Sequence, residues 1–228
     1  MTDRLLLVRH GVTTWNREGR FQGHRDAPLA DDGRLEARLL GERVAGMRVG
    51  GLELITSSLS RAADTAVIVA SALVPTGAPP RAPRADDRLM EIGQGEWEGR
   101  THAELAVHDA DRYAAWRARA GEEQPPGAET IEAALARVMS LLTEVTAHPG
   151  AAACLVSHGG ILRLVARQLL GLDPRRAWAM DVDNASLSEL RRDGPGGAWL
   201  VVRWNDTAHL LGRTPQHVDE SDGEPLAL

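Results

Sequence analysis

The sequence of 228 residues contains no lysine, so that all 26 of its basic residues are arginine. Two kinds of enzyme need a lysine and are therefore excluded: P-loop nucleotide enzymes and enzymes that form a Schiff base through an amine. Guanidinium and backbone N–H groups remain as the groups that can bind an anion, and a guanidinium holds phosphate through two hydrogen bonds. Codon usage can also produce an arginine-only composition, but the exclusion holds in either case.

Cysteine and long apolar runs are scarce as well. Cys154 is the single cysteine, which excludes an intramolecular disulfide and a thiolate metal cluster. No apolar run approaches the roughly 20 residues of a membrane-spanning helix. The formal net charge of -6 argues against nucleic acid or an acidic membrane surface as the main partner. The first predicted strand begins close to Met1, so we expect no signal peptide and a cytoplasmic globular protein.

Strand and helix patterns alternate along the chain. Short apolar runs predict buried strands, and apolar residues at helical spacing predict helices. The predicted strands are 5–9, 52–56, 84–90, 151–157, 185–190 and 199–202. The predicted helices are 31–47, 102–119, 130–146 and 160–170, together with a helix that follows the second strand. Ser58 or Ser60 is the predicted N-cap of that helix, which ends at Leu73. Asp31 or Asp32 is the predicted N-cap of the first helix. The alternation predicts an α/β fold, a three-layer sandwich with a mostly parallel central sheet and helices on both faces.

The expected organisation is a single domain over residues 1–212. Residues 100–128 form a small helical cap within it, and residues 213–228 form an acidic, poorly ordered tail. The cap segment is expected to fold over the ligand crevice, where its aromatic and arginine side chains would contact the leaving group. An amphipathic surface helix without that role is the alternative.

Charged residues follow the ends of several predicted strands. Arg9 and His10 end the first strand, Arg61 follows the second, Glu91 the third, and His158 the fourth. In open α/β sheets, ligands bind beyond the carboxyl ends of the strands. Two histidines, two arginines and one carboxylate are thus predicted to share one crevice. Since an unpaired cation is costly to bury, we expect an anion beside Arg9.

Each of these residues has an ordinary structural explanation when taken alone. A lone histidine at a strand end is more often a packed or surface residue than a catalyst. A metal site is a further alternative, because the chain has 8 histidines. However, there is no His-Glu-x-x-His motif, no close His-x-His pair and no thiolate set. We therefore predict no metal and no cofactor.

Arg9-His10-Gly11 begins a series of motifs that continues to the end of the predicted domain. The main ones are Thr14-Trp15-Asn16, Arg20-Phe21-Gln22-Gly23, Ser57-Ser58 with Arg61-Ala62, Arg88-Leu89-Met90-Glu91, Gly95-Glu96-Trp97-Glu98-Gly99, Val156-Ser157-His158-Gly159-Gly160 and Asn184-Ala185-Ser186. In this order the motifs resemble the histidine phosphatase superfamily, in the branch that contains cofactor-dependent phosphoglycerate mutase and related phosphatases. The resemblance spans about nine-tenths of the chain.

The resemblance implies a mechanism and a set of site residues. His10 would attack phosphorus and become a phosphohistidine, and Glu91 would protonate the leaving alcohol and then activate water. Arg9, Arg61 and His158 would hold the equatorial oxygens of the transition state, so that no metal is needed. Gly11 would leave room for the phosphoryl group. The implied substrate-binding residues are Gly11, Asn16, Gln22, Gly23 and Gly159.

Phosphatases and mutases of this family share these residues and differ in the segment after Glu91. The mutases have a longer insertion there, with a lysine and an arginine pair that hold a second phosphate. This chain has no lysine and no arginine pair between Glu91 and His158. The further cations that we identify are cap arginines such as Arg117 and Arg119. We therefore predict a metal-independent phosphomonoester hydrolase acting on a small phosphorylated metabolite. A phosphoglycerate mutase and a non-catalytic phospho-ligand-binding protein remain alternatives, the physiological substrate is not assigned, and a homodimer is left open.

Overall fold

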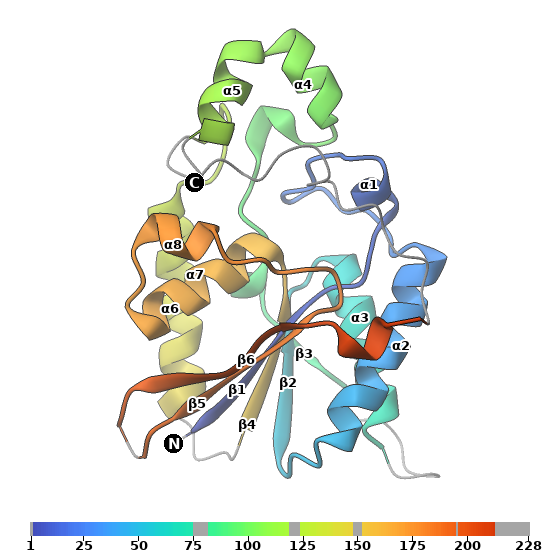
Figure 1. Ribbon diagram of the computed structural model, residues 1–228, viewed down its shortest axis with the longest axis vertical. Helices are drawn as coiled ribbons and strands as arrows, with labels where there is room; N and C mark the ends of the chain where they lie inside the picture. Colours follow the sequence, from blue (N-terminus) through green and yellow to red (C-terminus); the bar gives the residue numbers. More distant parts are fainter. Residues whose placement is uncertain (1, 75–81, 119–123, 148–151, 195, 213–228) are drawn as a thin grey trace.

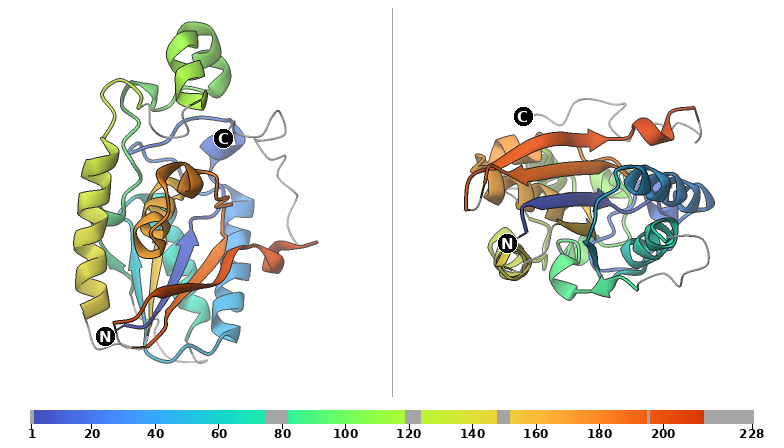
Figure 2. Two further views of the ribbon diagram at one scale, coloured as in Figure 1. Left: turned by 60° about the vertical axis from the view of Figure 1, so that its left-hand side comes forward. Right: turned by 90° about the horizontal axis from the view of Figure 1, so that it is seen from below.

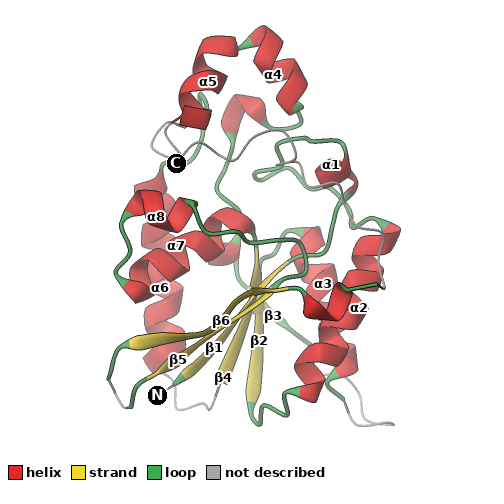
Figure 3. Ribbon diagram, in the orientation of Figure 1, coloured by secondary structure: helices red, strands yellow, loops and turns green. Residues whose placement is uncertain are grey.

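The computed structural model describes residues 2–74, 82–118, 124–147, 152–194 and 196–212 (Figure 1). Within them lie eight α-helices and one six-stranded sheet (Figure 3). The elements are β1 (Arg4–Arg9), α1 (Thr14–Arg17), α2 (Asp31–Gly46), β2 (Leu52–Thr56), α3 (Ser60–Ala72), β3 (Arg84–Ala85), α4 (His102–His108), α5 (Ala110–Ala118), α6 (Ile131–Ala147), β4 (Ala152–Ser157), α7 (Gly159–Leu170), α8 (Pro174–Trp178), β5 (Leu187–Arg192) and β6 (Trp199–Asp206). The predicted α/β fold class is confirmed.

The strand order in the sheet is β3-β2-β4-β1-β5-β6. The first four strands of this order are parallel to one another, whereas β5 and β6 add an antiparallel hairpin at one edge. The carboxyl ends of β1, β2 and β4 therefore meet at the same edge of the sheet. The end view in Figure 2 shows the sheet between its two helix layers.

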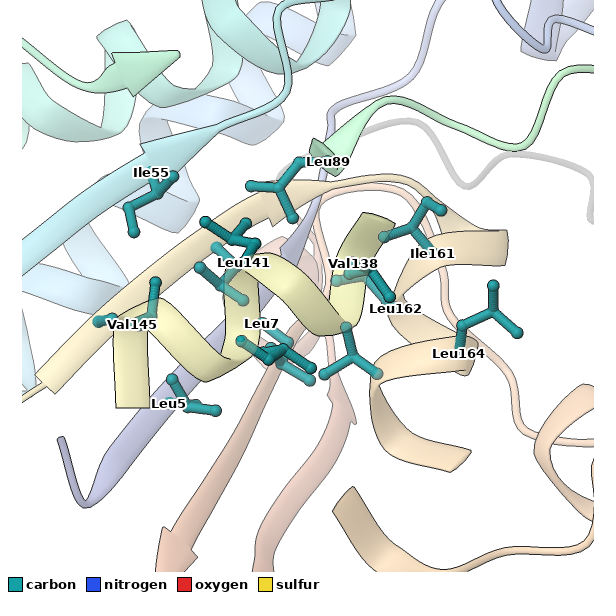
Figure 4. Close-up of a cluster of buried hydrophobic side chains, with 14 of the residues drawn as sticks. Leu5, Leu7, Ile55, Leu89, Val138, Leu141, Val145, Ile161, Leu162 and Leu164 are labelled. Carbon is teal, nitrogen blue, oxygen red and sulfur yellow. The ribbon is translucent and has the colours of Figure 1, made fainter. Parts of the chain in front are cut away.

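The apolar run at the start of the chain is buried on both faces of the sheet. Leu5 and Leu7 pack in a cluster that α6 and α7 complete (Figure 4). Leu6 and Val8 pack on the opposite face, against residues of α2 and α3. Full burial of such a side chain contributes about 1.5–3 kcal/mol, so this strand is a principal source of stability.

Cys154 lies in β4, among the apolar side chains that face α2 and α3. It is fully buried, and burial raises the pKa of its thiol to about 12. The thiol is therefore neutral at physiological pH and packs as a small apolar group.

The predicted N-caps of two helices were wrong. Asp31 and Asp32 lie in the first turn of α2, and its N-cap is Ala30, whose side chain cannot accept a hydrogen bond. Ser60 is likewise the first residue of α3, and its backbone N–H donates to both carboxylate oxygens of Asp26 at 3.0 Å. A carboxylate from a distant loop thus replaces the expected local cap.

The third predicted strand is much shorter than expected. β3 ends at Ala85, and a 3-10 turn follows at Asp87–Leu89. The side chain of Asp86 accepts the backbone N–H of Arg88 at 3.0 Å and also pairs with its guanidinium. This local capping ends the strand and releases the loop that carries Glu91.

The predicted helix 102–119 is divided into α4 and α5. The break is at Asp109, where φ is -142° and ψ is 43°, and the Asp109 carboxylate accepts the indole N–H of Trp97 at 2.9 Å. Phe21, Trp97, Leu105 and Tyr113 form a separate apolar cluster beneath the two helices. Figure 1 shows α4 and α5 apart from the sandwich, above the edge where β1 and β4 end. Arg119 and the predicted tail at 213–228 lie outside the described residues.

No helix in the described part of the chain has both the length and the apolar character needed to cross a membrane.

Candidate active site

The parallel pairing of β1 and β4 brings the two predicted histidines together. Arg9 is opposite Ser157 in the sheet, and the backbone N–H of His10 donates to the carbonyl of Ser157 at 3.0 Å. His158 follows Ser157 directly. The rings of His10 and His158 consequently lie 5.1 Å apart between centroids, tilted by 59°.

His10 is held in one tautomer. Its Nδ1 lies 2.7 Å from the carbonyl oxygen of Gly11, which can only accept, so Nδ1 carries the proton and Nε2 has a free lone pair. The side chain is buried, and burial together with the positive charges of Arg61 and Arg9 holds the pKa of His10 well below its ordinary value. The geometry therefore presents a neutral imidazole that can act as a nucleophile at neutral pH.

His158 is fully buried and has the opposite tautomer. Its Nδ1 accepts a hydrogen bond from Nε of Arg61 at 3.2 Å, so the proton is on Nε2, which donates to Oγ of Ser57 at 2.9 Å. Burial, then the positive charges of Arg61 and Arg9, hold the pKa of His158 well below its ordinary value. Both ring nitrogens thus have protein partners in this structure.

Arg61 is a buried cation, with 1% of its surface exposed. Besides His158, its guanidinium donates to the carbonyl oxygens of Arg25 at 3.0 Å and Gly23 at 2.8 Å. The carboxylate of Asp26 lies 3.8 Å away. Burial lowers the pKa of Arg61 to about 10, which leaves it charged at neutral pH. The loop at residues 23–26 therefore fixes the position of a positive charge at the centre of the site.

Glu91 lies beside the start of α7. Its carboxylate accepts the backbone N–H groups of Ile92 at 2.9 Å and Gly160 at 3.2 Å. A Cβ on Gly160 would lie 2.6 Å from a carboxylate oxygen of Glu91, so glycine is needed for this approach. The backbone carbonyl of Glu91 accepts from Arg137 at 2.9 Å and lies 2.8 Å from Nε2 of His24. Both ends of this residue are therefore fixed.

Asn16 lies in α1, the short helix that follows His10 in the chain. Its Oδ1 accepts the backbone N–H of Thr13 at 3.1 Å and the amide of Asn184 at 3.4 Å. The same Asn184 amide donates to the carbonyl of His10 at 3.1 Å, and the Thr13 hydroxyl lies 3.1 Å from Oε1 of Gln22. With its oxygen occupied, Asn16 keeps its Nδ2 group as a donor for an anion.

The glycine at position 11 has a packing reason that the sequence did not suggest. A Cβ on Gly11 would lie 2.4 Å from the backbone oxygen of Gly33 in the first turn of α2. This close approach of two backbones requires glycine, whether or not a phosphoryl group also needs the room. Gly23 has φ of +51°, and a Cβ there would meet the carboxylate of Glu98 at 2.2 Å.

Several residues at the site were not assigned a role from the sequence. Ser57 and Thr65 are buried, and Thr65 Oγ1 accepts the backbone N–H of Gly11 at 3.1 Å and donates to the carbonyl of Arg61 at 2.7 Å. Arg163 lies in α7, four residues after Gly159. That helical spacing places both on one face and is the signal that could have identified Arg163.

Among the residues that the structure describes, no group of three or more histidine, cysteine, aspartate or glutamate side chains is placed to hold a metal ion. The positive charge around His10 comes from Arg61 and Arg9, which lower the pKa values of His10 and His158.

The fold and the site together define a class of α/β protein in which two neutral histidines and a buried arginine meet beyond the ends of parallel strands. A family model described as the histidine phosphatase superfamily (branch 1) matches residues 5–207, and the chain belongs to this superfamily. The predicted family and the predicted enzyme class, a phosphomonoesterase of the histidine phosphatase type, are confirmed.

Two relatives and one solved structure illustrate the range of the similarity. The chain is 34% identical over 214 residues to the glucosyl-3-phosphoglycerate phosphatase of Mycolicibacterium vanbaalenii, covering 88% of this chain and 91% of the relative. It is 33% identical over 220 residues to a Yersinia enterocolitica protein named probable phosphoglycerate mutase GpmB, covering 91% and 94%. A mycobacterial glucosyl-3-phosphoglycerate phosphatase solved with VO3 has a TM-score of 0.76 and 33% identity, covering 90% of this chain and 99% of that one.

Proposed function

We propose that this protein is a metal-independent phosphomonoester hydrolase that acts through a phosphohistidine on a small phosphorylated metabolite. The observation that carries the proposal is the state of His10. Its proton is fixed on Nδ1 by the Gly11 carbonyl, its Nε2 lone pair is free, and its pKa is held low by burial and by Arg61 and Arg9. A neutral imidazole beside fixed positive charge is suited to attack a phosphate dianion.

In the proposed first step, Nε2 of His10 forms a bond to phosphorus while the bond from phosphorus to the leaving oxygen breaks. Glu91 enters this step protonated and gives its proton to the leaving alcohol. In the second step the ionised Glu91 takes a proton from water, whose oxygen attacks phosphorus and releases His10. Two backbone N–H groups fix the carboxylate beside α7, which supports this role in both steps.

We assign Arg9, Arg61 and His158 to the equatorial oxygens of the phosphoryl group. The charge of a loose transition state is spread over these oxygens, and fixed cations stabilise it most in a site that excludes water. His158 has its proton on Nε2, so it can donate to a phosphoryl oxygen by giving up its hydrogen bond to Ser57. Its buried Nδ1 remains held by Arg61.

The substrate-binding roles extend to the loop after β1 and the start of α7. We assign the Nδ2 group of Asn16, the amide of Gln22 and the backbones of Gly11, Gly23 and Gly159 to the phosphoryl group or the atoms beside it. Residues 100–128 are proposed to act as a cap within one domain that extends over residues 1–212. The cytoplasmic location also belongs to this proposal.

Mutase activity is a second candidate, because a Yersinia relative carries a mutase name at 33% identity. The absence of lysine, and of an arginine pair between Glu91 and His158, favours hydrolysis. A screen of phosphate esters with the purified protein, beside His10→Ala, separates an enzyme from a binding protein. A coupled enolase assay with 3-phosphoglycerate and added 2,3-bisphosphoglycerate then separates the two activities: we expect phosphate release to exceed interconversion, and the reverse would contradict the assignment.

A further inference from the structure

A third guanidinium group lies at the phosphoryl site and has no role in the proposed mechanism. Nη1 of Arg163 is 3.2 Å, and Nε of Arg9 is 3.8 Å, from the point where a Cβ on Gly159 would lie. The two arginines therefore approach the same glycine, which follows His158 directly. Arg163 is thus a neighbour of the phosphoryl-binding residues rather than a distant surface residue.

The protein holds Arg163 by one side of its guanidinium. Nε donates to the carbonyl of Met180 at 2.8 Å, and Cζ lies 5.7 Å from the ring centre of Trp178. Among the described residues, the two terminal amino groups of Arg163 make no hydrogen bond and no ion pair. The group is therefore oriented, as a recognition residue needs to be, but keeps two parallel donors unused.

The charges around Arg163 are compatible with a bound anion. Burial and the like charge of Arg9 lower its pKa to about 10, so it is charged at neutral pH. The opposing charges come from Glu91, Asp181 and Asp183, and both aspartates are exposed to solvent. Two adjacent guanidinium groups at a half-buried position destabilise each other unless an anion lies between or beside them.

A phosphoryl group alone does not account for this arrangement. Arg9, Arg61 and His158 already supply donors for its three equatorial oxygens. Two parallel N–H donors of one guanidinium match the two oxygens of a carboxylate. A second phosphate would carry about two negative charges and need more than one cation.

We propose that Arg163 binds a carboxylate of the substrate, so that the preferred substrates are phosphate esters that carry a carboxylate near the phosphate. This inference rests on the proposed function and narrows its substrate class. Arg163 would act as a specificity residue: it would hold the non-reacting end of the substrate and contribute mainly to substrate binding.

Two matched pairs of esters test the proposal. 3-Phosphoglycerate and glycerol 3-phosphate differ in the carboxylate, as do phosphoserine and phosphoethanolamine. We compare kcat and KM for the wild type, Arg163→Gln and Arg167→Gln. Arg167 is the matched control, because it lies one turn further along α7 and carries the same charge. Thermal unfolding of each variant is measured alongside.

The wild type is expected to prefer the carboxylate-bearing ester of each pair. Arg163→Gln should lower kcat/KM for those esters about 10- to 100-fold, chiefly by raising KM, because a charge-assisted bidentate contact is lost. The carboxylate-free esters should change by less than about threefold, and Arg167→Gln should change neither class.

Three results would overturn the inference: no preference in the wild type, an unchanged preference in Arg163→Gln, or an equal loss with both esters of a pair. An equal loss with both esters would mean that Arg163 contacts the phosphoryl group or stabilises the fold, and the unfolding temperature distinguishes these two roles. Failure of the proposed function looks different. In that case His10→Ala would release phosphate from the carboxylate-free esters as fast as the wild type does.

Discussion

Arg61 donates from Nε to Nδ1 of His158 over 3.2 Å, and both side chains are buried. A guanidinium has only donors, so this hydrogen bond requires an unprotonated Nδ1 and places the ring proton on Nε2. A buried cation thus sets the tautomer of a buried imidazole, and the two residues act as one unit. A change at Arg61 is expected to alter His158 as well as the local charge.

Arg61→Lys should lower kcat/KM for p-nitrophenyl phosphate by at least about 100-fold. Lysine keeps the charge, but it cannot contact His158, Arg25 and Gly23 together as the guanidinium does. Steady-state kinetics measure the effect, and Arg167→Lys is the control for the loss of an arginine elsewhere. Retention of more than about a tenth of the activity would show that the planar guanidinium, with its several N–H donors, is not needed at position 61.

His10→Ala should abolish turnover and leave the protein folded, because its neighbours in the sheet are unchanged. A substrate with radioactive phosphate should label the wild type through an acid-labile, hydroxylamine-sensitive bond and should not label the variant. Circular dichroism checks that the variant is folded. A folded His10→Ala protein with full activity would refute the phosphohistidine mechanism.

Glu91→Gln should slow alkyl phosphates much more than p-nitrophenyl phosphate. An alkoxide needs a proton to leave, whereas p-nitrophenolate hardly does. Both substrates slow to some degree, because the second step also uses Glu91, so the ratio of the two rates is the measurement. Glu132→Gln, at an exposed position of α6, is the control. An unchanged ratio would mean that another group protonates the leaving alcohol.

The free energy of unfolding should fall as the pH is lowered below about 6.5. The pKa values of His10 and His158 are held well below their ordinary value in the fold, so the unfolded chain binds more protons in this range. Stability therefore rises with pH until the unfolded histidines are neutral, and it is lost as pH falls from there towards the folded pKa values.

Urea unfolding at several pH values between about 5.5 and 7.5 measures this slope. Each histidine contributes up to about 1.4 kcal/mol per pH unit. His10→Asn should remove one such contribution, while His108→Asn, at an exposed position of α4, should leave the slope unchanged. Equal slopes for the wild type and His10→Asn would contradict a depressed pKa at His10.

Gly11→Ala should destabilise the protein by about 1–3 kcal/mol or more, because the new methyl group overlaps the backbone of α2. The overlapping atom is the carbonyl oxygen of Gly33, 2.4 Å from the Cβ position. At Gly159 the nearest atom to a new Cβ is Nη1 of Arg163, at 3.2 Å, and no backbone atom lies as close, so Gly159→Ala should cost less. Chemical unfolding compares the two; a Gly11→Ala protein as stable as the wild type would remove the packing explanation.

Much of the site could be predicted from the sequence because strand ends are local features. The apolar run at 5–8 predicts a strand buried on both faces, and the polar residues after it must then lie at the edge of the sheet. The same reasoning applies to His158 after β4. Parallel pairing of β1 and β4 then brings the residues that follow the two strands together at one edge of the sheet.

The remaining features depend on contacts between distant parts of the chain. Asp26 supplies the cap of α3 from 34 residues away, and Ser57 meets His158 across 101 residues. The spacing of Gly159 and Arg163 places them on one face of a helix, but it does not show that Arg9 approaches the same face. No pattern of local spacing contains these partners.

The buried thiol of Cys154 can report how often the centre of the protein opens to solvent. The strand that carries it pairs with β1 on one side and β2 on the other, so the thiol lies in the middle of the sheet. A thiol reagent can reach it only when the helices on that face move away or the sheet separates. The rate of its modification in native buffer therefore measures how often the centre of the protein opens, and because the sequence has one cysteine, the signal comes from one known position without any added label.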